Sequence, residues 1–138
     1  MNIEYTVLLV VIAMHSLLGF VWYSPLFFGV QSRILSSILT SNEVSHESKV
    51  IYENKLYVWN ALVAFVMALV LSNFINLLKI NTVTDAIQLC FWLWFGFVAP
   101  TTFSGVLFSH VPRKLWLIQT GYCLVSLLCM GTIIVVMQ

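Results

Sequence analysis

The sequence has 138 residues, of which 61% are hydrophobic and only 8% are charged, whereas a soluble domain is about 45–50% apolar and about 25% charged. This composition excludes an ordinary soluble globular protein. The formal net charge is +1, from six basic and five acidic residues, and there is no basic run. Binding to nucleic acid is therefore excluded, because it needs several Lys and Arg side chains on one face.

The charged residues leave four long uncharged stretches, which are Tyr5–Ser32, Leu56–Leu78, Ala86–Pro112 and Leu115–Gln138. Each exceeds the about 20 residues that cross a bilayer as a helix. We predict an all-α integral membrane protein, in which residues 1–138 form a single domain with transmembrane helices at about residues 5–23, 56–78, 84–108 and 115–137. Four such helices use about 80 positions, which leaves no room for a separate catalytic domain.

The first uncharged stretch is expected to remain as a helix and not to be removed as a signal peptide. Met1–Thr6 contains Glu4 and no basic residue, and the apolar run ends in Trp22-Tyr23-Ser24-Pro25 instead of a small-residue cleavage site. The proline should end this helix, because it lacks an amide proton and disfavours helix at the residue before it.

The connector at residues 24–55 carries most of the charge and two helix signals. Apolar residues between Leu26 and Leu39 recur at helical spacing opposite polar ones, which predicts a short amphipathic helix lying in the membrane interface between the first and second spans. Thr40-Ser41-Asn42-Glu43 then has the spacing of a capping box. It predicts the start of another helix that can continue into the second span.

Two of the predicted spans carry small or polar residues at successive i+4 positions. Such stripes let another helix approach closely, so we interpret them as helix-packing surfaces in preference to a ligand path. The residues are Asn60, Ala64, Ala68, Ser72 and Asn76 in the second span, and Gly96, Pro100 and Ser104 in the third.

The third span is expected to be kinked at Pro100. Inside a membrane the backbone carbonyls that a proline leaves free need new partners. The hydroxyl groups of Thr101, Thr102 and Ser104 are near enough in the sequence to supply them. The span should begin at Thr84-Asp85, because an acidic side chain suits the positive end of a helix.

The basic residues predict the orientation. Arg33, Lys49 and Lys55 lie in the first connector and Arg113 and Lys114 follow the third span, against Lys79 alone in the remaining loop. The positive-inside rule then places both connectors in the cytoplasm and both chain termini outside it. Arg33, Arg113 and Lys114 are also candidates for binding an anionic lipid headgroup.

His15 is the one titratable side chain that the prediction places near the bilayer centre. A polar group at that depth usually faces the interior of a bundle or a water-filled path. Three roles are open for His15: a hydrogen bond to a neighbouring helix, a function with protons or substrate, or ligation of a metal or haem.

Other chemistry has little support in the sequence. No His, Cys or carboxylate partner recurs at ligand spacing on one helix, so neither a metal nor a cofactor is expected. Cys90, Cys123 and Cys129 lie inside apolar spans and are expected to act as packing residues. There is no G-x-S-x-G, Walker or G-x-G-x-x-G motif. We therefore expect a protein that is not an enzyme.

Three segments of the chain, Gly19–Gly29, Trp94–Val98 and Ile118–Tyr122, resemble a family of small bacterial membrane proteins, domain of unknown function 1761. The block Trp-Tyr-Ser-Pro-Leu-x-Phe-Gly within Gly19–Gly29 is the most specific part, and the resemblance covers nearly the whole chain. It implies four helices in a bacterial inner membrane, which is the plasma membrane, and supplies no activity.

The chain departs from the family pattern at three positions. The family often has an acidic residue where this chain has Ser109, and a histidine where it has Cys123. His15 stands where an apolar residue would be expected. A family role that depends on that acid or that histidine is therefore not expected here.

These observations favour a self-associating helical bundle that binds or transports a small molecule. The alternative is an accessory or structural subunit that packs against a larger membrane complex. The expected partners are the lipid bilayer, other copies of the chain in a homo-oligomer and, in the alternative case, another membrane protein. Nothing in one sequence separates these two hypotheses, since small-residue stripes and buried polar groups serve both.

Overall fold

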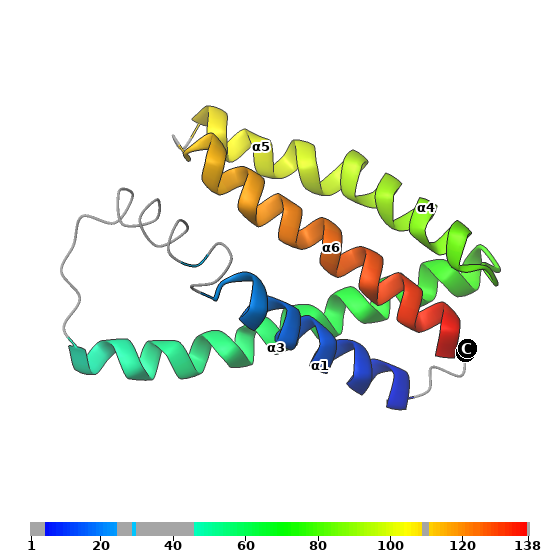
Figure 1. The fold of residues 1–138 in the computed structure, drawn as a ribbon, viewed down its shortest axis with the longest axis horizontal. Helices are drawn as coiled ribbons and strands as arrows, with labels where there is room; N and C mark the ends of the chain where they lie inside the picture. Colours follow the sequence, from blue (N-terminus) through cyan, green and yellow to red (C-terminus); the bar gives the residue numbers. More distant parts are fainter. Residues whose placement is uncertain (1–4, 25–28, 30–45, 109–110, 138) are drawn as a thin grey trace.

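The computed structural model describes residues 5–24, 29, 46–108 and 111–137, and these form helices joined by short turns (Figure 1). The helices are α1 (Tyr5–Trp22), α3 (His46–Leu77), α4 (Val83–Leu93), α5 (Ala99–Phe108) and α6 (Arg113–Met137), with a π-helical segment, η1 (Trp94–Val98), between α4 and α5. The described part of the chain contains no strand. The predicted all-helical class is therefore confirmed.

Three helical segments are long and apolar enough to cross a membrane. They are Val58–Leu77, Val83–Phe108 and Arg113–Met137. The apolar helix α1 has 18 residues, or about 27 Å at 1.5 Å per residue, against a hydrocarbon core of about 30 Å. Four membrane-spanning helices are expected, and three of the described helices have the length and composition to span a membrane. The expected interfacial helix and the capping box lie outside the described residues.

Helix α1 ends where the sequence predicts, at the residues before Pro25. The amide of Tyr23 donates to the carbonyl of Gly19, and the amide of Ser24 turns to the carbonyl of Val21. The amide of Gly29 then donates back to the carbonyl of Ser24, 3.0 Å away. A Cβ atom at position 29 would lie 2.7 Å from that same oxygen. The glycine of the Trp-Tyr-Ser-Pro block is therefore required by a close backbone approach.

Helix α3 is continuous for 32 residues, so the helix of the connector runs into the second span without a break from His46 onward. Its end is a Schellman motif. The amide of Ile80 donates to the carbonyl of Ile75, the amide of Lys79 donates to the carbonyl of Asn76, and Lys79 has a φ of 52°. This turn reverses the direction of the chain within a few residues, and α4 begins directly after it.

The third predicted span begins one residue before its expected start. Thr82 is the N-cap of α4, and its hydroxyl oxygen accepts a hydrogen bond from the amide of Asp85 at 3.2 Å. The Thr82 hydroxyl also donates to the Asp85 carboxylate at 2.6 Å. This reciprocal pair resembles a capping box with Asp in place of Glu.

A kink is expected at Pro100, and the structure has the π-helical segment η1 just before the helix that contains this proline. The amide of Ala99 donates to the carbonyl of Trp94, one residue further back than in an α-helix. The hydroxyl of Thr101 donates to the carbonyl of Phe97, and that of Thr102 donates to the carbonyl of Val98 at 2.7 Å. The two threonines thus supply donors to carbonyls beside the proline, and the helix continues to Phe108.

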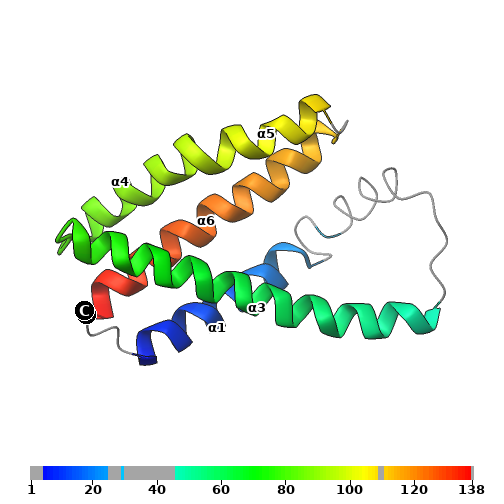
Figure 2. The ribbon, with the colours of Figure 1, turned by 180° about the vertical axis from the view of Figure 1, so that it is seen from behind.

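Helix α6 is the centre of the bundle and contacts every other described helix and η1. Figures 1 and 2 show α4, η1 and α5 in one rod on one side of α6, and α1 and α3 crossing on the other. The main core consists of small and branched side chains from four helices. Its fully buried members include Val11, Ala64, Ala68, Ile75, Ala86, Cys90 and Met130.

Candidate functional site

The candidate site is the polar cluster around His15, which lies where α1 packs against α6. The His15 side chain is buried, with 3% of its surface exposed. Its Nδ1 atom is 2.5 Å from the hydroxyl oxygen of Ser126, and its Nε2 atom is 3.1 Å from the hydroxyl oxygen of Tyr122. The Asn60 side chain of α3 also lies near the ring. The cluster therefore joins α1 to α6, with α3 beside it.

The hydrogen bonds of Tyr122 fix the protons in this cluster. Its hydroxyl group donates to the backbone carbonyl of His15 at 3.2 Å. Because a phenol has one proton, the oxygen then accepts from Nε2–H of His15. The Nδ1 atom of the neutral imidazole is left to accept from the hydroxyl of Ser126. Both hydroxyl groups are thus satisfied without any charged group.

Gly19 makes room for this arrangement one turn after His15. A Cβ atom at position 19 would lie 3.0 Å from the Tyr122 hydroxyl oxygen, closer than ordinary packing allows. The rings of Trp22 and Tyr23 also pack against Tyr122, with centroids 6.3 and 5.5 Å away. The indole of Trp22 donates to the carbonyl of Ile118 at 3.2 Å. The end of α1 is therefore held to α6 by aromatic contacts as well as by His15.

The Ser126–His15 pair has the composition of a nucleophile and its base, but both side chains are buried. Ser126 is fully buried, and the described part of the chain holds no group of His, Cys, Asp or Glu that could bind a metal ion. No buried side-chain nitrogen or oxygen among the described residues lacks a hydrogen-bond partner. Chemically, the cluster is suited to holding helices together.

The small-residue stripe of the second span lies largely in the interior. Ala64 and Ala68 are fully buried and Ser72 is nearly so. Asn60 is half-buried beside His15, whereas Asn76 is exposed and its amide donates to the carbonyl of Ser72 at 2.9 Å. Helix α3 contacts both α1 and α6, which the short side chains permit.

The stripe of the third span has the opposite placement. Gly96, Pro100 and Ser104 are all exposed, and a Cβ atom at Gly96 would meet nothing within 4 Å. These residues are not packed against the described helices. The contacts between this span and α6 come from other positions, including the Trp94 indole, which donates to the carbonyl of Thr120 at 2.9 Å.

The headgroup candidates are only partly placed. Arg113 and Lys114 lie side by side and exposed at the start of α6, and Arg33 lies outside the described residues. The three cysteines are free thiols, Cys90 buried and Cys123 and Cys129 half-buried. Cys90 packs against Gly131, where a Cβ atom would lie 2.5 Å from the sulfur.

A groove runs along the outer side of α1. It has a volume of about 600 Å³. Apart from Cys129 of α6 it is lined by residues of α1, which are Val10, Ala13, Met14, Leu17, Leu18 and Val21. No sequence pattern indicated this groove, because the residues that line it are ordinary for any apolar helix.

The buried histidine, the long apolar helices and the all-helical fold define a class of protein: a small helical bundle with the composition of a membrane protein. Residues 6–135 match a family described as a protein of unknown function, DUF1761, and the chain belongs to that family. The resemblance noted in the sequence is thereby confirmed. Neither the curated proteins nor the solved structures contain a match to this chain.

Proposed function

We propose that the protein is an integral membrane protein with a structural role, which self-associates through the outer face of α4, η1 and α5. One observation carries this proposal. The most apolar 18-residue window within Val83–Phe108 contains no buried residue, whereas the corresponding windows of the other two long spans are 28% and 33% buried. This span has the smallest share of buried residues among the three long spans. It therefore has the most surface available to contact another membrane protein.

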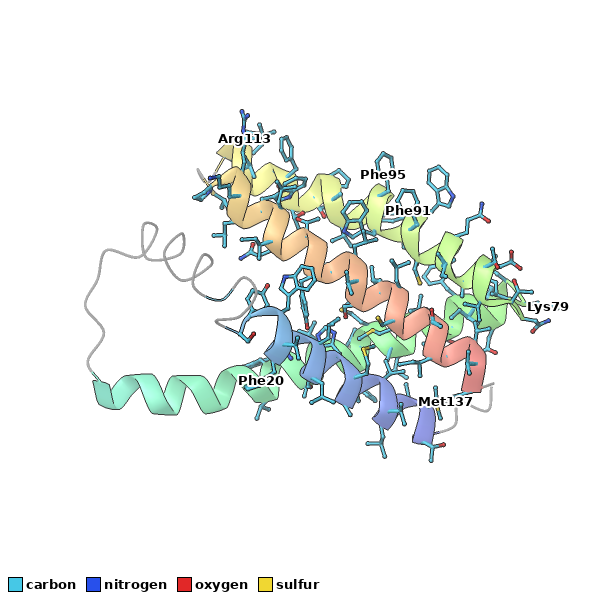
Figure 3. The ribbon with its side chains drawn as sticks, viewed as in Figure 1. Phe20, Lys79, Phe91, Phe95, Arg113 and Met137 are labelled. Atoms are coloured by element: carbon cyan, nitrogen blue, oxygen red, sulfur yellow. The ribbon has the colours of Figure 1, made fainter. Side chains whose placement is uncertain are left out.

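The chemistry of that face supports a protein neighbour. Five exposed residues follow one another at i+4 spacing, and these are Gln88, Trp92, Gly96, Pro100 and Ser104. The small central residues would let a second helix approach closely, and the Gln88 amide is a polar group that a facing helix could satisfy. The rings of Phe91 and Phe95, which point away from the bundle (Figure 3), stack with centroids 6.0 Å apart.

The closed cluster around His15 supports a structural role over a catalytic or transport role. Both ring nitrogens of His15 are occupied by hydroxyl groups of α6. Within the described residues, the groove that accompanies this helix is lined by apolar residues and Cys129. A polar solute would find neither a path nor a free partner beside His15.

Self-association can be tested with Gly96→Leu in lipid nanodiscs or mild detergent. The added side chain meets nothing in the bundle and would hold a second helix away. We expect the dimer dissociation constant to rise about tenfold, measured by light scattering over a dilution series. Ala13→Leu is the matched control, because it adds similar bulk to an exposed position of α1 and should leave the constant unchanged.

Two results would contradict self-association. One is a wild-type protein that remains monomeric at every lipid ratio, and the other is an equal effect of Gly96→Leu and Ala13→Leu. If native-detergent purification instead yields a different membrane protein in stoichiometric amount, the chain is an accessory subunit of a larger complex.

A second candidate function is the binding of an apolar molecule in the α1 groove. The groove is open along one side and lined by apolar side chains, so an acyl chain could lie in it. A fluorescent fatty acid is a suitable probe. Ala13→Leu, which fills the groove, should weaken its binding, whereas Gly96→Leu should not. Equal binding by all three proteins would dismiss this candidate.

The proposed location is the bacterial inner membrane, with both termini outside the cytoplasm. Arg113 and Lys79 lie at opposite ends of the bundle (Figure 3), and the end with Arg113 carries Lys114 as well. The positive-inside rule supports a cytoplasmic position for that end. A reporter enzyme that is active only outside the cytoplasm, fused after Gln138, should therefore be active.

A further inference from the structure

We infer that Arg113 and Lys114 bind the phosphate group of an anionic phospholipid in the leaflet at that end of the bundle. The two cations are consecutive and exposed at the first turn of α6. The acidic side chain of Asp85 is bonded to Thr82 at the start of α4. In Figure 3, Lys79 near that start and Arg113 lie at opposite ends of the bundle.

The surroundings of the two cations are those of a membrane boundary. Trp116 follows Arg113 by three residues and therefore lies on the same side of α6. Its indole donates to the hydroxyl of Thr102 at 3.0 Å, and its ring meets Phe103 edge-on with centroids 5.1 Å apart. Amphipathic rings of this kind settle at the level of lipid headgroups. Trp116 and Phe103 therefore indicate the depth in the membrane at which the phosphate would lie.

Below this level the surface is apolar and uncovered. Leu117, three residues after Lys114, is 61% exposed, and Phe97 of η1, which lies nearer the middle of the bundle than Thr102, is 68% exposed. Acyl chains can lie against these side chains while the headgroup reaches the cations above. A lipid matches both parts of the surface, whereas a free phosphate ion would match only the upper part. We therefore commit to a phospholipid as the occupant.

Lipid retention tests the inference directly. The purified protein would be reconstituted in vesicles of equal phosphatidylglycerol and phosphatidylcholine, extracted in mild detergent, and analysed for bound lipid by native mass spectrometry. Arg113→Gln combined with Lys114→Gln should lower the retained phosphatidylglycerol about tenfold relative to phosphatidylcholine, since each cation near an anionic surface attracts it measurably. Lys79→Gln, which removes one cation from the opposite end, should change the ratio little.

Three outcomes would overturn the inference. The ratio could remain unchanged in the double variant, or it could fall as far in Lys79→Gln, which would show an effect of overall charge. Excess inorganic phosphate could also displace all of the bound lipid, which would identify a soluble anion as the ligand. Circular dichroism and the elution volume show whether the double variant keeps its helices. None of these results depends on whether the protein self-associates.

Discussion

The two sides of α6 are built differently. On one side, α1 and α3 pack against α6 around His15, Ser126, Tyr122 and Asn60 together with small residues. Hydrogen bonds between individual side chains define this contact. On the other side, α4, η1 and α5 pack along α6 through buried small residues such as Ala86 and Cys90 and leave many of their large apolar side chains exposed. Lipid tails are as apolar as Leu, so membrane helices gain little by burying apolar side chains. Close packing and hydrogen bonds should therefore decide which contacts are strong.

The largest effect is expected where α4 packs tightly against Gly131 of α6. Gly131→Leu would place a side chain where a Cβ atom alone lies 2.5 Å from the Cys90 sulfur. Overpacking of this kind costs about 1–3 kcal/mol, and we expect a loss near the upper end, measured by denaturant titration in bicelles. Gly96→Leu, on the open side of the same span, should cost nothing. Equal stability of the two variants would mean that Cys90 and Gly131 are not in contact.

A smaller effect is expected where α1 meets α6. His15→Ala would leave the hydroxyl group of Ser126 buried without its partner, whereas the Tyr122 hydroxyl would lose the donor on the ring and keep its bond to the carbonyl of residue 15. A buried hydroxyl group without a partner costs about 1–3 kcal/mol in proteins generally, whereas hydrogen bonds in membrane proteins average about 0.6 kcal/mol. We therefore expect a total loss of about 1–2 kcal/mol, with a smaller loss for Ser126→Ala.

The outcome for His15→Ala also separates the roles that the sequence left open. If His15 is structural, the variant loses stability, and a second variant, His15→Asn, regains part of it through its shorter amide. If the histidine serves a transported proton or solute, liposome flux would fall while stability stayed the same. That second result would contradict the structural role proposed above.

The ends of the helices could be predicted from the sequence because charged residues, prolines and capping residues act locally. We expect helices at residues 5–23 and 84–108, and the structure is helical from Tyr5 to Trp22 and from Val83 to Phe108. Pro25 and Thr82 mark boundaries through their own backbone and side-chain chemistry. A kink is expected at Pro100, but the π-helical segment before it depends on the whole turn and could not be predicted.

The partners of His15 could not be predicted, although its burial was anticipated. Ser126 lies 111 residues away in the sequence and Tyr122 lies 107 residues away. In a soluble protein, apolar periodicity would show which face of each helix is buried. In this chain the outward-facing and the buried sides of the helices are both apolar, so the sequence pattern does not show which faces pack together. Tyr122 belongs to a segment that resembles the family, but that resemblance does not indicate its contact with His15.

The smallest effect is expected at Gly19, and it measures how closely α1 must approach α6. Gly19→Ala would bring a Cβ atom to 3.0 Å from the Tyr122 hydroxyl oxygen, so the phenol would have to move by a few tenths of an ångström. Alanine favours helix over glycine by about 1 kcal/mol, which offsets part of the cost, and we expect a net loss below about 1 kcal/mol.

Gly121→Ala is the control, since its Cβ atom would lie 3.6 Å from the Trp22 ring, an ordinary contact. A Gly19 variant as stable as the Gly121 variant would mean that the tyrosine has room to shift, and that the His15 cluster tolerates a looser α1. A Gly19 variant that is less stable, in a background where His15→Ala adds no further loss, would show that the two positions act through the same hydrogen bond.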